Sequence, residues 1–134
     1  MNVKKYLTFK GRINRKIYLY LQLIFLISYI FFAIYKPDNL IQSLLFWSIL
    51  LFRNFIGITT SVQRLHDINT PGIVLLIPMI LGLVGQLANV YILLLIACGF
   101  YCHLMITKGT YGPNKYGNDP LNHTTEYVTL LNEI

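Results

Sequence analysis

The sequence has few charged residues for a chain of its length. Only 12% of its 134 residues are charged, with 11 lysines and arginines against 5 aspartates and glutamates. An ordinary globular domain has about 25% charged residues, and a small one needs them to cover its large surface. The hydrophobic content of 55% also excludes intrinsic disorder, which requires low hydrophobicity and high charge. The composition therefore predicts a membrane protein.

Cysteine and acidic residues are also rare, which argues against most kinds of catalytic or metal site. The two cysteines, Cys98 and Cys102, lie in one predicted apolar helix, so we interpret both as small hydrophobic side chains rather than a disulfide or metal site. No two acidic residues share a motif, and G-x-S-x-G, H-E-x-x-H and G-x-G-x-x-G are absent. His66 precedes Asp67, but adjacent helical side chains point apart. We therefore expect no enzyme and no cofactor.

The positive charge is concentrated near the N-terminus. Residues 1–16 contain six lysines and arginines and no acidic residue, which equals the whole formal net charge of +6. Basic residues beside a membrane span orient it and attract anionic lipid, at about 1 kcal/mol each near the surface. Because this stretch adjoins an apolar run, we expect anionic lipid headgroups as partners, not nucleic acid, and a cytoplasmic N-terminus. Tyr6, Phe9, Ile13 and Ile17 recur here at helical spacing, which favours a segment lying in the membrane interface.

Two apolar runs have the length of membrane spans. The first, residues 17–35, has no charge and would form about 28 Å of helix, close to the hydrocarbon thickness of a bilayer. Asn14 can cap this helix, and Asn39 can cap the next one after a short turn. The second span covers residues 40–58, and its helix is predicted to continue to about Ile68 because no helix breaker occurs earlier.

The third apolar region has two interpretations. Residues 73–106 contain no Asp, Glu, Lys or Arg, and one straight helix of that length would measure about 51 Å. The region is either one long, kinked helix or two short helices hinged near residues 82–89. Two helices return Lys108 and Lys115 to the cytoplasmic side and leave only Lys36 outside, as the positive-inside rule favours. We therefore predict an all-α membrane bundle with three to four transmembrane helices, and favour four, with the last two short and tightly connected.

The composition changes after the last apolar region. Residues 107–120 contain three glycines, two prolines and two asparagines, which is typical of successive turns. We therefore assign residues 1–120 to one membrane-embedded helical domain. Residues 121–134 form a polar C-terminal tail.

A polar stripe follows one face of the second predicted helix. At 100° per residue, its members lie within about 40° of Arg53; they are Arg53, Gly57, Thr60, Arg64 and Asp67. Charged side chains that face lipid are costly, so the stripe should face neighbouring helices, where Arg53 meets a polar or carbonyl partner. Arg64 and Asp67 have the i, i+3 spacing of an ion pair. The alternative is that Arg53 only extends to the near membrane interface.

Three polar motifs resemble those of a known family. They are Gly11, Arg12, Arg15 and Lys16; then Arg64, Leu65, His66 and Asp67; then Gly112, Asn114, Tyr116, Gly117, Asp119 and Pro120. In this order they resemble the small bacterial inner-membrane proteins catalogued as domain of unknown function 805. Gln63 and Lys115 stand where that family has arginine, and Ile73 and Val74 stand where it usually has two tryptophans. The resemblance implies an inner-membrane location and no particular activity.

With both termini cytoplasmic, the polar motifs meet on one face of the bundle. There we predict a cluster that either binds anionic lipid or locks the helix ends together. Its candidate residues, with those of the stripe, are Arg12, Arg15, Arg53, Arg64, His66, Asp67, Asn114, Lys115 and Asp119. The sequence favours a multi-pass inner-membrane protein that binds lipid, a membrane-protein partner or a second copy of itself. The alternative is a small transporter or channel component that uses the stripe from Arg53 to Asp67.

Overall fold

The computed structural model describes residues 3–121, whose secondary structure is helical and includes no strand. The four α-helices are α1 (Arg15–Ile34), α2 (Leu40–Asp67), α3 (Leu76–Leu87) and α4 (Tyr91–Ile106). Two short 3-10 helices, η1 (Val3–Leu7) and η2 (Gly72–Leu75), precede α1 and α3. The third apolar region is therefore a pair of helices, as the charge distribution favoured. Of the predicted tail, only Leu121 lies within the described residues.

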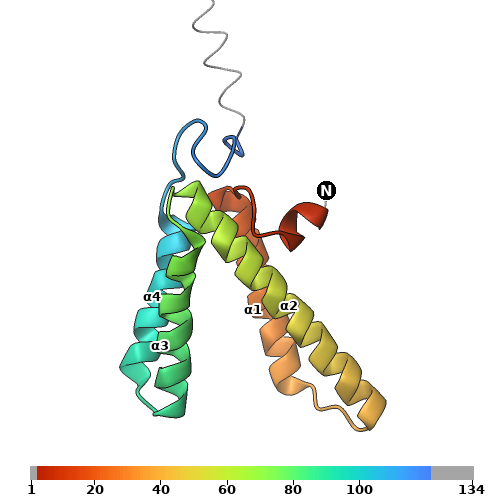
Figure 1. The fold of residues 1–134 in the computed structure, drawn as a ribbon. Coiled ribbons are helices and arrows are strands. Elements are labelled where there is room, and N and C mark those ends of the chain that lie inside the picture. Colours follow the sequence, from red (N-terminus) through yellow and green to blue (C-terminus); the bar gives the residue numbers. More distant parts are fainter. Residues whose placement is uncertain (1–2, 122–134) are drawn as a thin grey trace, which may run out of the picture.

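The helices form two antiparallel hairpins that meet at one end and diverge toward the other (Figure 1). One hairpin consists of α1 and α2, and the other of α3 and α4, which have the most extensive mutual contact. We call the shared end the polar end, because η1, the α2–α3 connection and residues 107–121 gather there (Figure 1). Gly85 permits the close approach of α3 to α4, since a Cβ at this position would lie 3.0 Å from Cβ of Leu93.

Local hydrogen bonds explain where α1 and α2 begin and end. The Asn14 side chain accepts a hydrogen bond from the backbone N–H of Ile17 at 2.9 Å, and Asn39 caps α2 in the same way. Both predicted caps are confirmed, as is the length of α2, which ends at Asp67. The chain then turns through Asn69, whose φ of 60° is left-handed and incompatible with a continuing helix.

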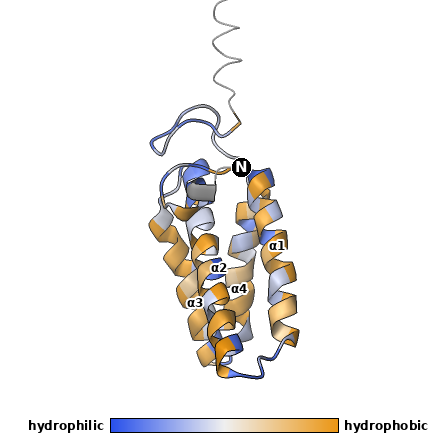
Figure 2. Cartoon of the chain, turned by 90° about the vertical axis from the view of Figure 1, so that its right-hand side faces the viewer, coloured by the Kyte–Doolittle hydropathy of each residue, from blue (hydrophilic) through white to orange (hydrophobic). Residues whose placement is uncertain are grey.

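The distribution of polar and apolar side chains is the reverse of that in a soluble domain. Hydrophobic residues dominate the helices (Figure 2). Many of their large apolar side chains are exposed, including Leu51 at 71% and Trp47 at 61%. The buried polar side chains in the described part of the chain are Arg12, Thr59, Thr60, Ser61, Gln63, Arg64, Asp67 and Asp119. Both α1 and α2 are long and apolar enough to cross a membrane, and only 6% and 0% of their most apolar windows are buried. The η2–α3 helix and α4 are apolar but shorter.

A small apolar core lies at the polar end. It contains Tyr6, Ile13, Tyr18, Val62, Leu65, Leu75 and Leu104, so it joins the N-terminal segment to both hairpins. The segment before α1 is not one continuous helix, because η1 ends at Leu7 and residues 8–14 contain no helix. Gly11 has a left-handed φ of 88°, and the backbone N–H of Ile13 donates to the carbonyl of Gln63 at 3.3 Å. The helix predicted from the spacing of Tyr6, Phe9, Ile13 and Ile17 was therefore wrong. Tyr6 and Ile13 instead pack separately in the core.

Candidate functional site

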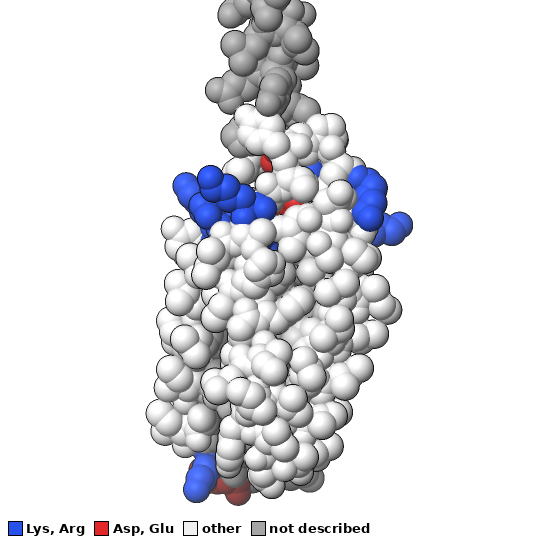
Figure 3. All heavy atoms as spheres, turned by 90° about the vertical axis from the view of Figure 1, so that its left-hand side faces the viewer, with Lys and Arg blue, Asp and Glu red and all other residues white. Residues whose placement is uncertain are grey.

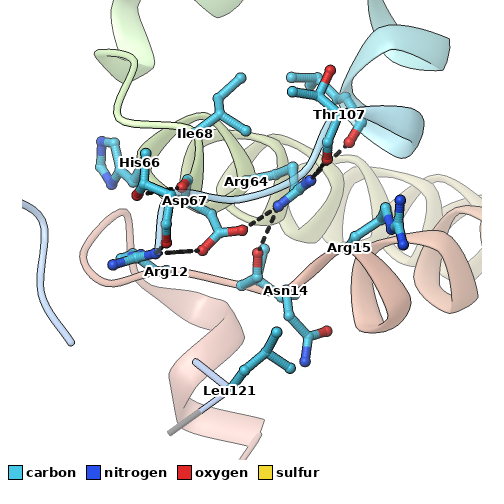
Figure 4. A network of polar contacts seen from close by, with 12 residues as sticks. Arg12, Asn14, Arg15, Arg64, His66, Asp67, Ile68, Thr107 and Leu121 are labelled. Carbon is cyan, nitrogen blue, oxygen red and sulfur yellow. Dashed lines mark hydrogen bonds and ion pairs between the residues drawn. The ribbon is translucent and has the colours of Figure 1, made fainter. Parts of the chain in front are cut away.

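Two arginines share one aspartate at the polar end (Figure 4). Asp67 Oδ1 accepts a hydrogen bond from Arg12 Nε at 3.1 Å and lies 3.0 Å from Arg12 Nη2. Asp67 Oδ2 accepts from Arg64 Nη1. The relative exposures of Arg12, Arg64 and Asp67 are 3%, 0% and 3%. The predicted pairing of Arg64 with Asp67 is confirmed, and Arg12 completes a buried triad with one excess positive charge.

The other donors of Arg12 are directed at the loop that follows α4. Arg12 Nη1 donates to the carbonyls of Gly112 and Gly117 at 2.6 and 3.3 Å, and Nη2 donates to the carbonyl of Thr110 at 2.6 Å. With the hydrogen bond to Asp67, this guanidinium donates four hydrogen bonds, and each of its three nitrogens has an acceptor within the protein. Arg12 therefore connects the segment before α1 to the end of α2 and to the loop after α4.

Arg64 connects α2 to the end of α4. Its Nε donates to the carbonyl of Leu104 at 2.9 Å, and its Nη2 donates to the carbonyl of Thr107. These are carbonyls of the last turn of α4 and of its C-cap, which lack partners within the helix. A buried cation bonded to several carbonyl dipoles and one carboxylate is stabilised without a second acid. The triad therefore locks three segments of the chain together.

The loop over residues 107–121 packs against the end of α2. Asn114 Nδ2 donates to the carbonyl of His66 at 2.9 Å, and the Tyr116 ring stacks on the His66 ring with centroids 3.9 Å apart. Asp119 Oδ2 accepts from the backbone N–H of Gly112 at 3.1 Å, which closes the loop on itself. The structure thus brings together the second and third motifs, as predicted, through side-chain and backbone contacts.

Gly109 lies against the triad and leaves no space for a side chain. A Cβ at Gly109 would overlap the carboxylate of Asp67. The next residue, Thr110, donates to the Asp67 carbonyl from its backbone N–H at 2.7 Å and from its hydroxyl at 2.9 Å. A larger residue at position 109 would therefore separate the loop from α2.

A rim of exposed cations surrounds the buried triad. We define the basic rim as Lys10, Arg15, Lys16, Lys108 and Lys115, all of them exposed. Arg15 Nη1 donates to the carbonyl of Ile106 at 3.2 Å, and Nζ of Lys115 lies 5.0 Å from the centroid of the Tyr116 ring. Basic side chains form a band near the polar end, with a second small group of charges at the opposite end (Figure 3). A cavity of about 250 Å³ lies at the rim and is lined in part by Arg15, Lys108 and Tyr111.

Arg53 lies apart from the triad. It precedes Asp67 by about 21 Å of helix, and its guanidinium contacts α1: Nε donates to Ser28 Oγ at 2.9 Å and Nη2 to the carbonyl of Phe25 at 2.7 Å. Nη1 donates to Asn54 Oδ1 at 3.3 Å. The prediction that Arg53 faces a neighbouring helix and meets polar or carbonyl partners is confirmed.

Gln63 has a role that the sequence did not reveal. Its side chain is fully buried, and Nε2 donates to the carbonyls of Lys5 and Thr8 at 2.7 Å and to that of Lys10 at 3.2 Å. Its Oε1 has no hydrogen-bond partner among the described residues. Gln63 therefore fixes the N-terminal segment to α2 through Nε2 of its side chain and through its backbone carbonyl, which accepts from Ile13. The only signal in the sequence was its place where the resembled family has arginine.

No metal centre is evident in the part of the chain that the structure describes. Residues 3–121 contain no group of three or more His, Cys, Asp or Glu side chains that could hold a metal ion. Cys98 and Cys102 are both exposed on α4 and form no disulfide.

A comparison with protein families gives one match. The family model described as "Protein of unknown function (DUF805)" matches residues 6–118. The match includes nearly all of the three polar motifs, so the resemblance inferred from them is confirmed. Neither a search of curated proteins nor a search of solved structures found a match.

Proposed function

The chain belongs to the DUF805 family of proteins of unknown function, and we propose that it is a multi-pass membrane protein that binds anionic lipid at its basic rim without catalysis. One observation carries the proposal. The buried arginines at the polar end donate to a carboxylate and to backbone carbonyls of the protein, whereas exposed cations lie at the boundary of exposed apolar helices. Cations in that position are suited to lipid phosphate.

The burial pattern of α2 supports a membrane boundary near Thr59. Residues 40–58 include no buried side chain, whereas almost every residue from Thr59 to Asp67 is buried. The exposed part has about 28 Å of helix, close to the thickness of the hydrocarbon core. The 20 residues of α1 give a similar length. We propose that lipid covers these apolar surfaces and that the polar end lies at headgroup depth.

The hairpin arrangement supports four spans with both chain ends on one side. The η2–α3 helix runs away from the polar end and α4 returns to it (Figure 1). Each has about 24 Å of helix, which is shorter than the hydrocarbon core, so these spans require little tilt or a locally thinner bilayer. Lys36 lies at the opposite end, while most other basic residues belong to the polar end. The positive-inside rule then favours a cytoplasmic polar end, in the inner membrane if the cell has two.

The rim cavity offers a place for a phosphate group. Arg15 and Lys108 line it together with Asn14 and the backbone around Gly109. Arginine can donate two parallel hydrogen bonds to phosphate, and lysine adds a point charge. Asp67 and Asp119 also line the cavity, which limits its positive potential and favours a single phosphate. The alternative, a transport pathway along the stripe, has less support because the triad closes the stripe at the polar end.

Native mass spectrometry with cardiolipin and phosphatidylglycerol tests this proposal. We expect the wild type to retain either lipid in preference to phosphatidylcholine. Arg15→Gln combined with Lys108→Gln should lose most of that retention without a change in melting temperature. Lys36→Gln, an exposed charge at the opposite end, is the matched control and should bind like the wild type. No preference for anionic lipid in the wild type would end the proposal.

A further inference from the structure

A cavity of about 360 Å³ lies between the two hairpins, away from the triad and the basic rim. All four helices line it, and its polar lining includes Gln22 of α1, Arg53 and Ser61 of α2, and Tyr101 of α4. Met79 of α3 and Phe25 of α1 are among its apolar lining residues. This hairpin cavity thus combines a cation with hydrogen-bonding groups inside an otherwise apolar region.

Two N–H groups of the Arg53 guanidinium donate no hydrogen bond to the described residues. Hydrogen bonds to Ser28, Phe25 and Asn54 use three of its five N–H groups. One N–H on each Nη has no acceptor among the described residues. Asp67 is the acidic partner in every ion pair within residues 3–121. Arg53 therefore has no carboxylate partner among these residues. A cation at membrane depth without a countercharge favours an anionic ligand.

An apolar groove begins at the same guanidinium. A second cavity of about 370 Å³ shares Gln22, Phe25 and Arg53 with the first. The rest of its lining is mainly apolar and comes mostly from α1: Leu19, Leu23, Leu26, Tyr29 and Met105. Arg53 therefore lies where a cavity that contains polar groups meets an apolar groove, an arrangement that matches an amphiphile with a small anionic head.

We propose that Arg53 binds the carboxylate of a single-chain fatty acid, with the head in the hairpin cavity and the chain along the α1 groove. This inference rests on the proposed membrane location. Arg53 lies about 9 Å of helix below Thr59, where we place the membrane boundary. The phosphate of a two-chain lipid is held at headgroup level, above that depth, whereas a fatty-acid carboxylate can reach it. One carboxylate also neutralises one guanidinium and can accept two parallel hydrogen bonds from it.

Binding of palmitate and of methyl palmitate to the purified wild-type protein in detergent tests the proposal. The two probes have the same chain, but only palmitate has a carboxylate. We expect one palmitate per chain and methyl palmitate at least tenfold weaker. Equal binding of the acid and the ester would overturn the proposal, and this comparison needs no substitution.

Variants then locate the site. Arg53→Gln should reduce palmitate binding at least tenfold and Arg53→Lys less, while both retain cardiolipin. Leu23→Trp reduces the volume of the groove while Arg53 is kept, and should also reduce palmitate binding. Arg15→Gln with Lys108→Gln is the matched control, with the opposite result: cardiolipin is lost and palmitate retained. If Arg53→Gln instead separated a dimer and left palmitate binding unchanged, Arg53 would serve a second copy of the chain and the proposal would be wrong.

Failure of this proposal is distinguishable from failure of the proposed function. A wild type that retains cardiolipin but binds acid and ester equally contradicts only the fatty-acid site. A wild type that binds palmitate through Arg53 without preferring anionic phospholipid contradicts only the proposal that the basic rim binds lipid.

Discussion

The carboxylate of Asp67 lies 3.0 Å from Nη2 of Arg12, a residue 55 positions earlier in the chain. This contact joins the segment that enters α1 to the last residue of α2. Both side chains are almost completely buried. Asp67 also pairs with Arg64, so this one carboxylate is the countercharge of two arginines. Removing one partner of a buried ion pair costs about 3–5 kcal/mol because the other charge remains uncompensated.

Asp67→Asn should therefore lower the free energy of unfolding by about 3–5 kcal/mol, since it leaves two buried guanidinium groups with no acid. The measurement is thermal or denaturant unfolding of the purified protein in detergent. Asp38→Asn is the matched control, because Asp38 is exposed at the opposite end, and its effect should stay within about 0.5 kcal/mol. Similar effects of the two substitutions would contradict a structural role for the triad.

Gly109→Ala should destabilise the protein by about 1–3 kcal/mol, because the added methyl group overlaps the Asp67 carboxylate and forces the loop away. Gly99→Ala provides the comparison. Gly99 lies inside α4 with nothing near its Cβ position, so alanine there should be neutral or add up to about 1 kcal/mol through helix propensity. Melting temperatures of the two variants should thus move in opposite directions, or only that of Gly109→Ala should fall.

Gln63→Leu should release the N-terminal segment. The substitution removes the donor that three backbone carbonyls share, at a cost of about 1–3 kcal/mol for partly buried acceptors left without a partner. Hydrogen exchange and limited proteolysis should both become faster around residues 5–10. Gln86→Leu, at an exposed position on α3, is the control. Unchanged exchange in the Gln63 variant would show that the core side chains alone hold the segment.

The proposed four spans make a labelling prediction. In a background in which Cys98 and Cys102 are replaced by alanine, Asp38→Cys should react with an impermeant thiol reagent from outside the cell. Asn118→Cys should react only after the membrane is opened, because the loop after α4 returns to the side of the N-terminus. External labelling of both positions would require an odd number of spans.

The sequence predicted features that depend on near neighbours. The side chains of Asn14 and Asn39 each accept from the backbone N–H three residues later, and Arg64 pairs with Asp67, also three residues later. Local spacing therefore determines both kinds of contact. The prediction that residues 73–106 form two helices, made from the distribution of basic residues, was also correct. Most partners of Arg12 and Gln63 could not be predicted, because they are backbone carbonyls. A carbonyl acceptor occurs at every residue, so it leaves no signature in the residue types.

Substitutions in the buried triad and in the basic rim should have different effects on stability and on lipid binding. Both arginines donate to backbone carbonyls and to Asp67. Their relative exposures are 3% and 0%, so neither side chain is accessible to a lipid phosphate. Arg12→Gln with Arg64→Gln should therefore lower the melting temperature strongly, while the protein that remains folded keeps its bound cardiolipin.

Arg15→Gln with Lys108→Gln should have the opposite effect, with cardiolipin lost and the melting temperature unchanged. Native mass spectrometry and thermal unfolding of the same samples make both comparisons. If the Arg12 and Arg64 substitutions abolished lipid binding at an unchanged melting temperature, the buried arginines would have to open to lipid. The triad would then bind a lipid headgroup instead of only holding the helix ends together.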